Sequence, residues 1–331
     1  MVDWGKATIL ITGGTGSFGR KCVERLLEEK HPKKLIVYSR DEWKQHEMRG
    51  GGLDDPSVRY FLGDVRDLER LRRAFKGVDI VIHTAALKQV PACEYNPNEA
   101  VATNIIGTKN VIDAAIDCGV QRVLTLSTDK AAAPVNIYGA TKLVAEKLSV
   151  HANAYSRFDE TIFSCVRYGN VLGSRGSVLP LFQEQKLRGR ITITDARMTR
   201  FWITLDQGVG FVLSCIDQMR GGEVFVPKLP SMKVVDLARV IAPDAEIETI
   251  GIRPGEKLHE SMLSADEARQ SVDAGDRYVI LPGDRPWIGD LWRHKSRKLP
   301  ENFEYTSDRN ERWLTFDEMA EMLDECEVAN A

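Results

Sequence analysis

Residues 7–19 read Ala7-Thr8-Ile9-Leu10-Ile11-Thr12-Gly13-Gly14-Thr15-Gly16-Ser17-Phe18-Gly19, an apolar run that leads directly into a glycine-rich turn. No polar face interrupts the run, which indicates a strand buried on both sides. Gly13, Gly16 and Gly19 have the spacing G-x-x-G-x-x-G, and a helical pattern begins at about Ser17. Such a turn lets backbone N–H groups approach a phosphate, and the helix N-terminus adds partial positive charge. This context predicts a bound dinucleotide.

Five further apolar runs of strand length follow the first one, with helical patterns between them. The runs are Leu35–Tyr38, Val58–Leu62, Val78–Ile82, Val123–Leu126 and Ile162–Val166, and the clearest helical patterns are Asp67–Phe75 and Val101–Cys118. Strands that alternate with helices predict an α/β fold with a Rossmann-type, doubly wound parallel sheet covered on both faces.

The pattern changes after Asn170, where a loop at 173–177 leads into shorter elements. These are Ile191–Ile193, Leu205–Met219, Val224–Val226, Val234–Ile241 and Ile247–Ile250. We therefore expect a Rossmann domain over residues 1–170 and a smaller substrate-binding lobe over residues 171–331, with the chain crossing back between them. Residues 285–300 are rich in Trp, Arg, Lys and Pro, and we expect irregular structure there.

The end of the second predicted strand bears on which dinucleotide binds. NAD sites usually place a carboxylate there for the ribose 2′-hydroxyl, whereas this chain has Ser39 and Arg40. Both side chains suit a 2′-phosphate, which favours NADP as the cofactor. The alternative is that Arg40 is solvated and Asp41 caps the next helix. Asp64 follows the third strand and either meets the adenine edge beside Val65 or caps a helix.

Tyr138 and Lys142 stand at positions i and i+4, so a helix presents both side chains on one face. A phenol with its ordinary pKa near ~10 is a poor base at neutral pH, and a neighbouring cation favours the phenolate. Because the pair follows the fifth strand of a predicted nucleotide-binding sheet, we interpret Tyr138 as a base for hydride-transfer chemistry.

The composition excludes several classes of function. The formal net charge is −3, so no basic excess exists for unspecific binding to nucleic acid or to an anionic membrane. No apolar run reaches the ~20 residues that cross a bilayer, and the first residues lack signal-peptide anatomy. The six cysteines are scattered without a C-x-x-C pair, and no metal-binding pattern is visible. We expect a cytoplasmic protein with reduced thiols, no nucleic-acid or membrane partner and no metal. His83 ends a strand and is interpreted as structural.

Longer motifs carry a resemblance to a known family. The glycine turn with Tyr-x-x-x-Lys resembles the extended short-chain dehydrogenase/reductase superfamily. Six further motifs are similar to the inverting UDP-N-acetylglucosamine 4,6-dehydratases, which begin pseudaminic acid biosynthesis: Phe61–Asp67, Ala85–Pro91, Ser127–Ala131, Arg167–Val171, Met198–Phe201 and Arg253–Leu258. The resemblance runs from about Ala7 to Glu260. Tyr138 separates the chain from a branch of this family that lacks the tyrosine.

The resemblance implies a reaction that begins and ends with hydride transfer. Such a dehydratase moves hydride from C4 of the sugar to tightly bound NADP, loses the C5 proton and the 6-hydroxyl, and takes hydride back at C6. Tyr138 is then the base for the 4-hydroxyl, assisted by Lys142, with Thr128 or Ser127 as a hydrogen-bond partner of the same hydroxyl. Lys130 transfers the C5 proton, and Asp129 assists the departure of the 6-hydroxyl oxygen. The product is a UDP-2-acetamido-2,6-dideoxy-4-keto-hexose with inverted C5 (L-arabino). The alternative is that Asp129 is a helix cap beside a solvated Lys130.

The glycine turn and the resemblance together assign two sets of binding residues. The cofactor set is Gly13, Thr15, Gly16, Ser17, Phe18, Gly19, Ser39, Arg40, Asp64, Val65, Ala85, Lys88, Tyr138 and Lys142. The substrate set, which includes cations for the diphosphate, is Lys88, Asn170, Arg175, Val178, Thr199, Arg200, Arg253 and Glu256. Relatives pair through helices, which implies a homo-oligomer.

Two other functions stay open at this point. A nucleotide-sugar epimerase of the same fold would share the glycine turn, Tyr138 and Lys142 but would not need Asp129 and Lys130. A non-catalytic protein that senses NADP would need neither pair, and retention of the hydride-transfer base argues against it.

Overall fold

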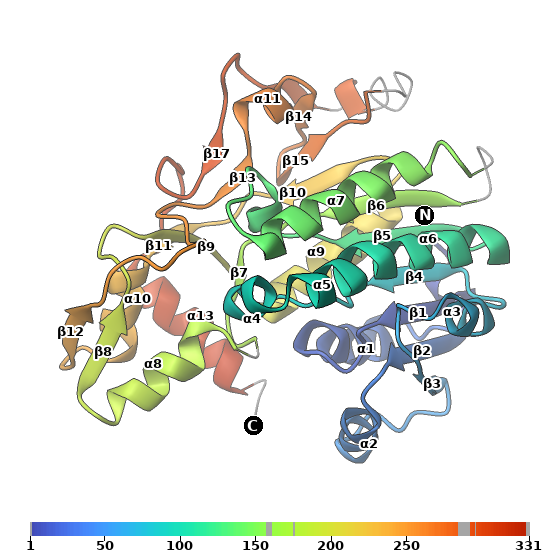
Figure 1. Cartoon of the computed structure of the whole chain (residues 1–331), viewed down its shortest axis with the longest axis horizontal. Helices are drawn as coiled ribbons and strands as arrows, with labels where there is room; N and C mark the ends of the chain where they lie inside the picture. The colour runs from blue at the N-terminus through green and yellow to red at the C-terminus, as the bar shows by residue number, and fades with distance from the viewer. Residues whose placement is uncertain (1, 157–160, 175, 284–291, 295, 329–331) are drawn as a thin grey trace.

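A ten-stranded sheet forms the centre of the molecule, and its strand order is β16-β14-β15-β10-β6-β5-β4-β1-β2-β3 (Figure 1). The structure is a computed structural model that describes residues 2–156, 161–174, 176–283, 292–294 and 296–328. Every pairing from β3 to β10 is parallel, whereas β15, β14 and β16 add antiparallel strands at one edge. The bounds are β1 (Thr8–Thr12), β2 (Lys34–Ser39), β3 (Val58–Leu62), β4 (Ile80–His83), β5 (Arg122–Leu126), β6 (Ile162–Val166), β10 (Val224–Pro227), β14 (Ser271–Asp273), β15 (Arg277–Ile280) and β16 (Arg297–Lys298).

The first strand is buried on both faces, as its uninterrupted apolar run predicts. Ile9 and Ile11 belong to one apolar core, together with residues of α1 (Ser17–Glu29) and α9 (Leu205–Gln218). Leu10 belongs to a second core, with residues of α3 (Leu68–Ala74), α6 (Gly107–Cys118) and α7 (Ile137–Ala152). Because successive strand residues point to opposite faces, helices cover both sides of the sheet. The predicted doubly wound α/β sheet is confirmed.

A smaller lobe lies to one side of the main sheet, on the left in Figure 1. Its apolar core joins Phe182, Ile191, Leu237 and Leu323 from four different elements. The elements around it are α8 (Val178–Lys186), β8 (Arg190–Ile193), α10 (Val234–Ile241), β12 (Glu246–Thr249) and α13 (Phe316–Val328). The chain crosses back after it enters this lobe, since β10 and β14–β16 lie in the main sheet.

The remaining elements connect the two lobes and shape the loops at the ends of the strands. Two small sheets have the orders β11-β9-β7 and β13-β17. The bounds are β7 (Asn170–Val171), β9 (Thr199–Ile203), β11 (Ser231–Lys233), β13 (Ser261–Leu263), β17 (Tyr305–Thr306), η1 (Trp4–Lys6), α2 (Glu42–Gly50), α4 (Val90–Tyr95), α5 (Pro97–Ala100), η3 (Asp129–Ala131) and α11 (Ala265–Ala268). None of the helices in the described part of the chain has the length and apolar character needed to cross a bilayer.

The helix predicted over Val101–Cys118 differs from the structure in its first turns. Residues Val101–Ile106 form a π-helical segment, η2, and the α-helix begins only at Gly107. Within η2 the buried Asn104 side chain accepts from the backbone N–H of Leu87 at 2.8 Å and donates to the Leu87 carbonyl at 2.9 Å. These bonds tie the segment to the loop after β4, and wide turns of this kind often occur at functional sites.

Half of the segment 285–300, expected to be irregular, lies outside the described residues. Its described end contradicts the expectation, because Arg297–Lys298 form the edge strand β16. These two residues pair with Val272 and Asp273 of β14. An edge strand offers unpaired backbone groups to a neighbouring segment, whatever the composition of that segment.

A buried ion-pair network anchors α7 at Glu146, one helical turn after Lys142. Arg167 directly follows β6 and is fully buried; its Nη2 lies 2.6 Å from Glu146 Oε1 of α7 and 2.6 Å from Glu267 Oε1 of α11. Removing one partner of a buried pair typically costs ~3–5 kcal/mol, because a charge is left uncompensated. The network therefore fixes α7 against the C-terminal part of the chain.

Candidate active site

A cavity of about 730 Å³ lies where the order of the parallel strands reverses, between β1 and β4. Its wall includes residues that directly follow three neighbouring strands: Gly13 after β1, Thr84 after β4 and Ser127 after β5. In open α/β sheets, ligands bind at the carboxyl ends of the strands near this reversal. The cavity is thus placed where the fold favours a ligand.

The glycine turn forms one wall of the cavity. Its glycines allow a positive φ and close packing against neighbouring backbone. Gly13 has φ +66°, and a Cβ there would lie 2.9 Å from the Cα of Ala85. Gly16 is the N-cap of α1 and makes no side-chain capping bond. At Gly19, a Cβ would lie 2.5 Å from the Cα of Gly14, so α1 packs directly on the turn. The N-terminus of α1 is therefore presented to the cavity as an anion site.

We expect Gly19→Ala to weaken dinucleotide binding and to lower stability. The new methyl group would force α1 away from the turn, and overpacking of this kind typically costs ~1–3 kcal/mol. Thermal melting and titration with the dinucleotide measure both effects. The matched control is Gly50→Ala, where a Cβ meets no atom within 4 Å. If Gly19→Ala melts and binds like Gly50→Ala, the close packing of α1 on the turn is not required.

His83 lies behind the turn and has the structural place expected from the sequence. Its Nδ1 is 2.7 Å from Thr12 Oγ1 and its Nε2 is 3.0 Å from Thr108 Oγ1. Burial lowers the pKa of His83 to about 3, so the ring stays neutral at physiological pH. The neutral ring bridges β1 and α6.

The residues expected to select the cofactor lie at the far end of the cavity. Ser39, Arg40 and Asp64 all line it. The Arg40 side chain is 56% exposed, and its Nη1 lies 3.7 Å from Asp64 Oδ2. Asp41 caps α2 by accepting from the Lys44 N–H at 3.0 Å, so the solvated-arginine alternative describes these contacts correctly. The contact of Arg40 with a 2′-phosphate stays a prediction.

Asp64 does not cap a helix, which removes one of its two predicted roles. Its Oδ1 accepts from the Arg66 N–H at 2.9 Å, and the N-cap of α3 is Asp67, which accepts from the Arg70 N–H at 3.0 Å. Asp64 and Val65 instead form part of the cavity wall. The remaining prediction is that Asp64 and Val65 contact the adenine edge of the dinucleotide.

Tyr138 and Lys142 lie together in the cavity wall on one face of α7. Both are at least nine-tenths buried. Lys142 Nζ donates to the Leu126 carbonyl at 2.5 Å, and burial lowers the pKa of Lys142 to about 8. Burial raises the pKa of Tyr138 to about 12, against the opposing effects of Lys130 and Thr128. Lys130 therefore favours the phenolate of Tyr138.

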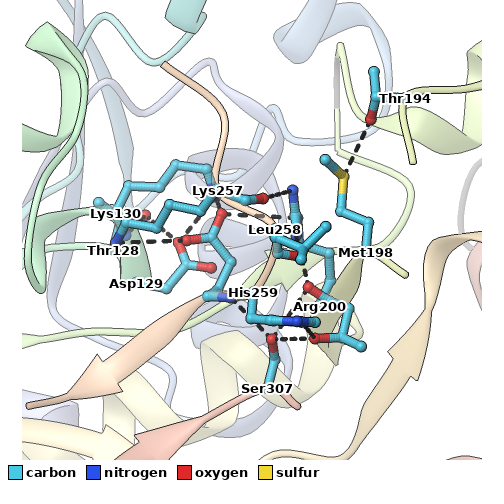
Figure 2. A network of polar contacts seen from close by, with 12 residues as sticks. Thr128, Asp129, Lys130, Thr194, Met198, Arg200, Lys257, Leu258, His259 and Ser307 are labelled. Carbon is cyan, nitrogen blue, oxygen red and sulfur yellow. Dashed lines mark hydrogen bonds and ion pairs between the residues drawn. The ribbon is translucent and has the colours of Figure 1, made fainter. Parts of the chain in front are cut away.

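Asp129 and Lys130 face the same cavity from the short helix η3. The residue that caps this helix is Thr128, whose Oγ1 accepts from the Lys130 N–H at 3.4 Å and donates to Asp129 Oδ1 at 2.8 Å. Lys130 Nζ lies 3.0 Å from the same Asp129 oxygen. The alternative of an Asp129 cap beside a solvated Lys130 is therefore wrong. Figure 2 shows Thr128, Asp129 and Lys130 drawn together in this network.

The fully buried Asp129 carboxyl is suited to carry a proton. Burial raises its pKa, although Lys130 and Thr128 act against this effect. Its Oδ2 is buried and has no hydrogen-bond partner among the described residues. A neutral carboxyl in such a position can serve as a general acid toward a group that enters the cavity.

Several polar atoms in the cavity wall fit a polar ligand. Besides Asp129 Oδ2, four buried oxygens of lining residues have no hydrogen-bond partner among the described residues: Thr103 Oγ1, Ser127 Oγ, Asn170 Oδ1 and Ser177 Oγ. Buried polar groups are normally hydrogen-bonded, so such a set points to partners that a ligand or ordered water supplies. Together with the glycine turn, these atoms fit a dinucleotide and a sugar nucleotide.

The substrate residues predicted from the sequence fall into three groups. Lys88, Asn170, Val178, Arg253 and Glu256 line the cavity. Burial lowers the pKa of Lys88, whose Nζ donates to Ser174 Oγ at 3.4 Å. Arg175 lies outside the described residues.

Thr199 and Arg200 form the third group, and neither lines the cavity. Thr199 Oγ1 lies 2.6 Å from Ser307 Oγ and 2.8 Å from His259 Nδ1. Arg200 donates to the carbonyls of Thr199, Leu258 and Lys257 at 2.6, 3.1 and 3.0 Å. Figure 2 shows this polar layer, which lies next to Asp129 and Lys130. The side chains of Thr199 and Arg200, predicted to contact the substrate, instead bind neighbouring segments of the chain.

Glu260 is the main site residue that sequence reasoning missed. Its Oε1 lies 3.2 Å from Lys130 Nζ, and the residue is 2% exposed. The motif Arg253–Leu258 ends two residues before it, which was the available signal. Nothing in the spacing connects residue 260 with residue 130. Among the described residues, no group of His, Cys, Asp and Glu could hold a metal ion.

Comparisons with known proteins agree with this geometry. Residues 9–282 match the family model described as polysaccharide biosynthesis protein. The chain is 49% identical over 330 residues to a Campylobacter jejuni protein named UDP-N-acetylglucosamine 4,6-dehydratase (inverting), covering 97% of this chain and 98% of that protein. It is 40% identical over 325 residues to a UDP-glucose 4-epimerase of Rickettsia canadensis, covering 96% and 95%. The X-ray structure of Pen from Bacillus thuringiensis is similar with a TM-score of 0.90 at 38% identity, covering 98% of this chain and 99% of that one.

Proposed function

The chain belongs to the polysaccharide biosynthesis protein family, within the group of the inverting UDP-N-acetylglucosamine 4,6-dehydratases, and on this premise we propose its reaction. It converts UDP-N-acetylglucosamine into a UDP-2-acetamido-2,6-dideoxy-4-keto-hexose with inverted configuration at C5. This reaction is the first step of pseudaminic acid biosynthesis, carried out by a cytoplasmic homo-oligomer.

One observation carries the proposal: two titratable pairs line a single cavity. Tyr138 and Lys142 would serve any hydride transfer at C4, including that of an epimerase. Asp129 and Lys130 add an acid and a base beside them, 3.0 Å apart. Elimination of water across C5 and C6 needs such a second pair, whereas epimerisation at C4 does not.

The cofactor that fits the glycine turn is a nicotinamide dinucleotide, which when bound accepts hydride from C4 and supplies it to C6. The N-terminus of α1 would hold its diphosphate. Lys142 would hold the ribose next to the nicotinamide, within reach of the Leu126 carbonyl to which its Nζ now donates. Lys88 and Arg253 supply positive charge in the same cavity for the diphosphate of the sugar nucleotide.

The side chains of the protein divide the proton transfers between them. Tyr138 takes the proton of the 4-hydroxyl as C4 becomes a ketone, and the ketone acidifies the hydrogen at C5. Lys130 in its neutral form takes the C5 proton, and Asp129 protonates O6 so that water leaves. A proton from solvent then reaches C5 on the opposite face, which inverts the configuration. The raised pKa of Asp129 suits its role as the acid.

Proton NMR of the product separates the two candidate reactions. We expect UDP-N-acetylglucosamine incubated with the protein and NADP to give a new 6-methyl signal, because only dehydration produces a 6-deoxy sugar. A 4-epimer without a 6-methyl signal would instead favour the epimerase, the activity named for the Rickettsia canadensis relative.

We expect the purified protein to carry NADP rather than NAD, because Ser39 and Arg40 stand where NAD enzymes place a carboxylate. Mass spectrometry of the cofactor released by denaturation identifies it. Arg40→Ala should reduce the preference for NADP over NAD only modestly, since the Arg40 side chain is more than half exposed. The control is Arg59→Ala, a cation of the neighbouring strand β3 that does not line the cavity. Release of NAD from the wild-type protein would overturn the assignment.

A further inference from the structure

Glu260 is a buried carboxylate held rigidly behind the cavity wall. It directly precedes β13 and does not line the cavity. Its backbone N–H donates to Ser307 Oγ at 2.9 Å, and its carbonyl accepts from the Ser307 N–H at 2.8 Å. With 2% of its surface exposed, the residue has little freedom to move. Burial of a carboxylate costs free energy unless cations compensate its charge. The cations that pair with Glu260 therefore indicate its role.

Among the described residues, three cations lie near Glu260, and Lys130 is the nearest of them. Lys130 Nζ lies 3.2 Å from Glu260 Oε1, whereas Arg200 Nε is 3.7 Å away and Lys257 Nζ is 3.9 Å from Oε2. Arg200 already donates to three backbone carbonyls, and Lys257 Nζ donates to the Ala132 carbonyl at 2.6 Å.

Lys130 Nζ, by contrast, is bound by two carboxylates in the described part of the chain, Asp129 at 3.0 Å and Glu260 at 3.2 Å. Figure 2 shows Lys130 and Lys257 in one polar network with Arg200. Glu260 belongs to that layer, while Asp129 belongs to η3, the same short helix as Lys130. The ammonium is therefore held between two elements far apart in the sequence.

We propose that Glu260 is a positioning residue for Lys130, which it holds against Asp129 so that the Lys130 amine is placed for proton transfer at C5. The inference rests on the proposed role of Lys130 as the group that takes the C5 proton. Glu260 itself touches neither substrate nor cofactor in this account, because it lies outside the cavity wall.

The charge of Glu260 also bears on the protonation of Lys130. The groups that face Lys130 are the anions Asp129 and Glu260, the cations Lys88, Arg200 and Lys257, and the phenol of Tyr138. Burial disfavours the ammonium, but Asp129 and Glu260 outweigh burial and raise the pKa of Lys130.

A lysine that accepts the C5 proton must first be neutral. The rate of C5 exchange should therefore rise with pH toward the pKa of Lys130. Removing the charge of Glu260 lowers that pKa, so the rise should move to lower pH. A role of Glu260 that is only structural would not move it.

The decisive variant is Glu260→Gln, which keeps the shape of the side chain and removes its charge. The rate of C5 deuterium incorporation is followed in deuterated water from about pH 6 to about pH 10. In this variant we expect the dependence of that rate on pH to shift to lower pH by ~1 unit or more. Glu260→Asp keeps the charge on a shorter side chain. In Glu260→Asp, C5 deuterium incorporation should rise with pH over nearly the same range as in the wild type. Its kcat should fall, on the order of 10-fold to 10²-fold for a misplaced group. KM should change little in both variants.

The control for loss of a buried ion pair is Glu267→Gln, since Glu267 pairs with Arg167, whereas the carboxylates paired with Lys130 are Asp129 and Glu260. It should lower the melting temperature and leave the pH dependence unchanged. The proposal is overturned if Glu260→Gln and Glu267→Gln show the same pH dependence as the wild type. Identical shifts in Glu260→Gln and Glu260→Asp would also overturn it. Failure of the proposed function is recognised separately, because Lys130→Ala would then keep C5 exchange or the wild type would form no 6-deoxy product.

Discussion

Tyr138→Phe should abolish turnover while the protein stays folded and keeps its cofactor. The substitution removes only the phenolic oxygen, and a general base typically contributes ~10²–10⁴-fold in rate. Lys142 Nζ is held by the Leu126 carbonyl, and the glycine turn lies on another wall of the cavity. The groups that bind the dinucleotide therefore remain in place.

Product formation by NMR and the cofactor content of the purified variant measure the two halves of this expectation. The matched control is Tyr155→Phe, which removes the same atom from a side chain beyond the end of α7 that is 77% exposed. Tyr155→Phe should turn over at the wild-type rate. Turnover by Tyr138→Phe at a comparable rate would reject Tyr138 as the base for the 4-hydroxyl.

Lys130→Ala should stop elimination after the first hydride transfer. Without the amine no group in this position takes the C5 proton, so we expect a ~10²–10⁴-fold loss of dehydration. Tyr138, Lys142 and the glycine turn are unchanged, and oxidation at C4 remains possible. A single turnover should therefore accumulate a 4-keto sugar together with reduced cofactor, which is visible by its absorbance. No deuterium should enter C5 in deuterated water.

This variant needs a stability control, because it leaves Asp129 and Glu260 buried without the cation between them. Cofactor retention and the melting temperature report on folding, and protonation of the freed carboxyls can relieve part of the cost. Lys147→Ala, on an exposed position of the same helix as Lys142, is the matched control and should behave as wild type. Dehydration by Lys130→Ala at a rate close to that of Lys147→Ala, with C5 exchange intact, would make Lys130 a bystander.

Features that depend on local spacing were predictable from the sequence. The run Thr8–Thr12 carries its own signal for a strand buried on both faces, and the turn after it needs glycine at Gly13 and Gly19 for reasons internal to that turn. Tyr138 and Lys142 are four residues apart, so forming the helix is enough to place them together. The parallel sheet follows from the alternation of such local elements.

Features that depend on contacts between distant segments were not predictable in this way. The contact between Lys130 and Glu260 joins residues 130 positions apart and depends on how β13 packs on η3. Thr199 and Arg200 carry a family motif, yet their side chains bind Ser307 and the 257–258 backbone behind the cavity. The π-helical turn at 101–106 has the same apolar pattern as an α-helix, and the contacts of Asn104 in this turn, with the Leu87 backbone and with Thr141 Oγ1, join segments distant in the sequence.

The measurement that tests the central claim most directly is NMR of the product formed by the wild-type protein from UDP-N-acetylglucosamine and NADP in deuterated water. Proton transfer by Lys130 with inversion predicts a 4-keto sugar of L-arabino configuration with one deuterium at C5. Its 6-methyl signal should lose its coupling to the C5 proton. A product with retained configuration at C5, a product with hydrogen at C5, or a 4-epimer that lacks the 6-methyl group would each contradict the account.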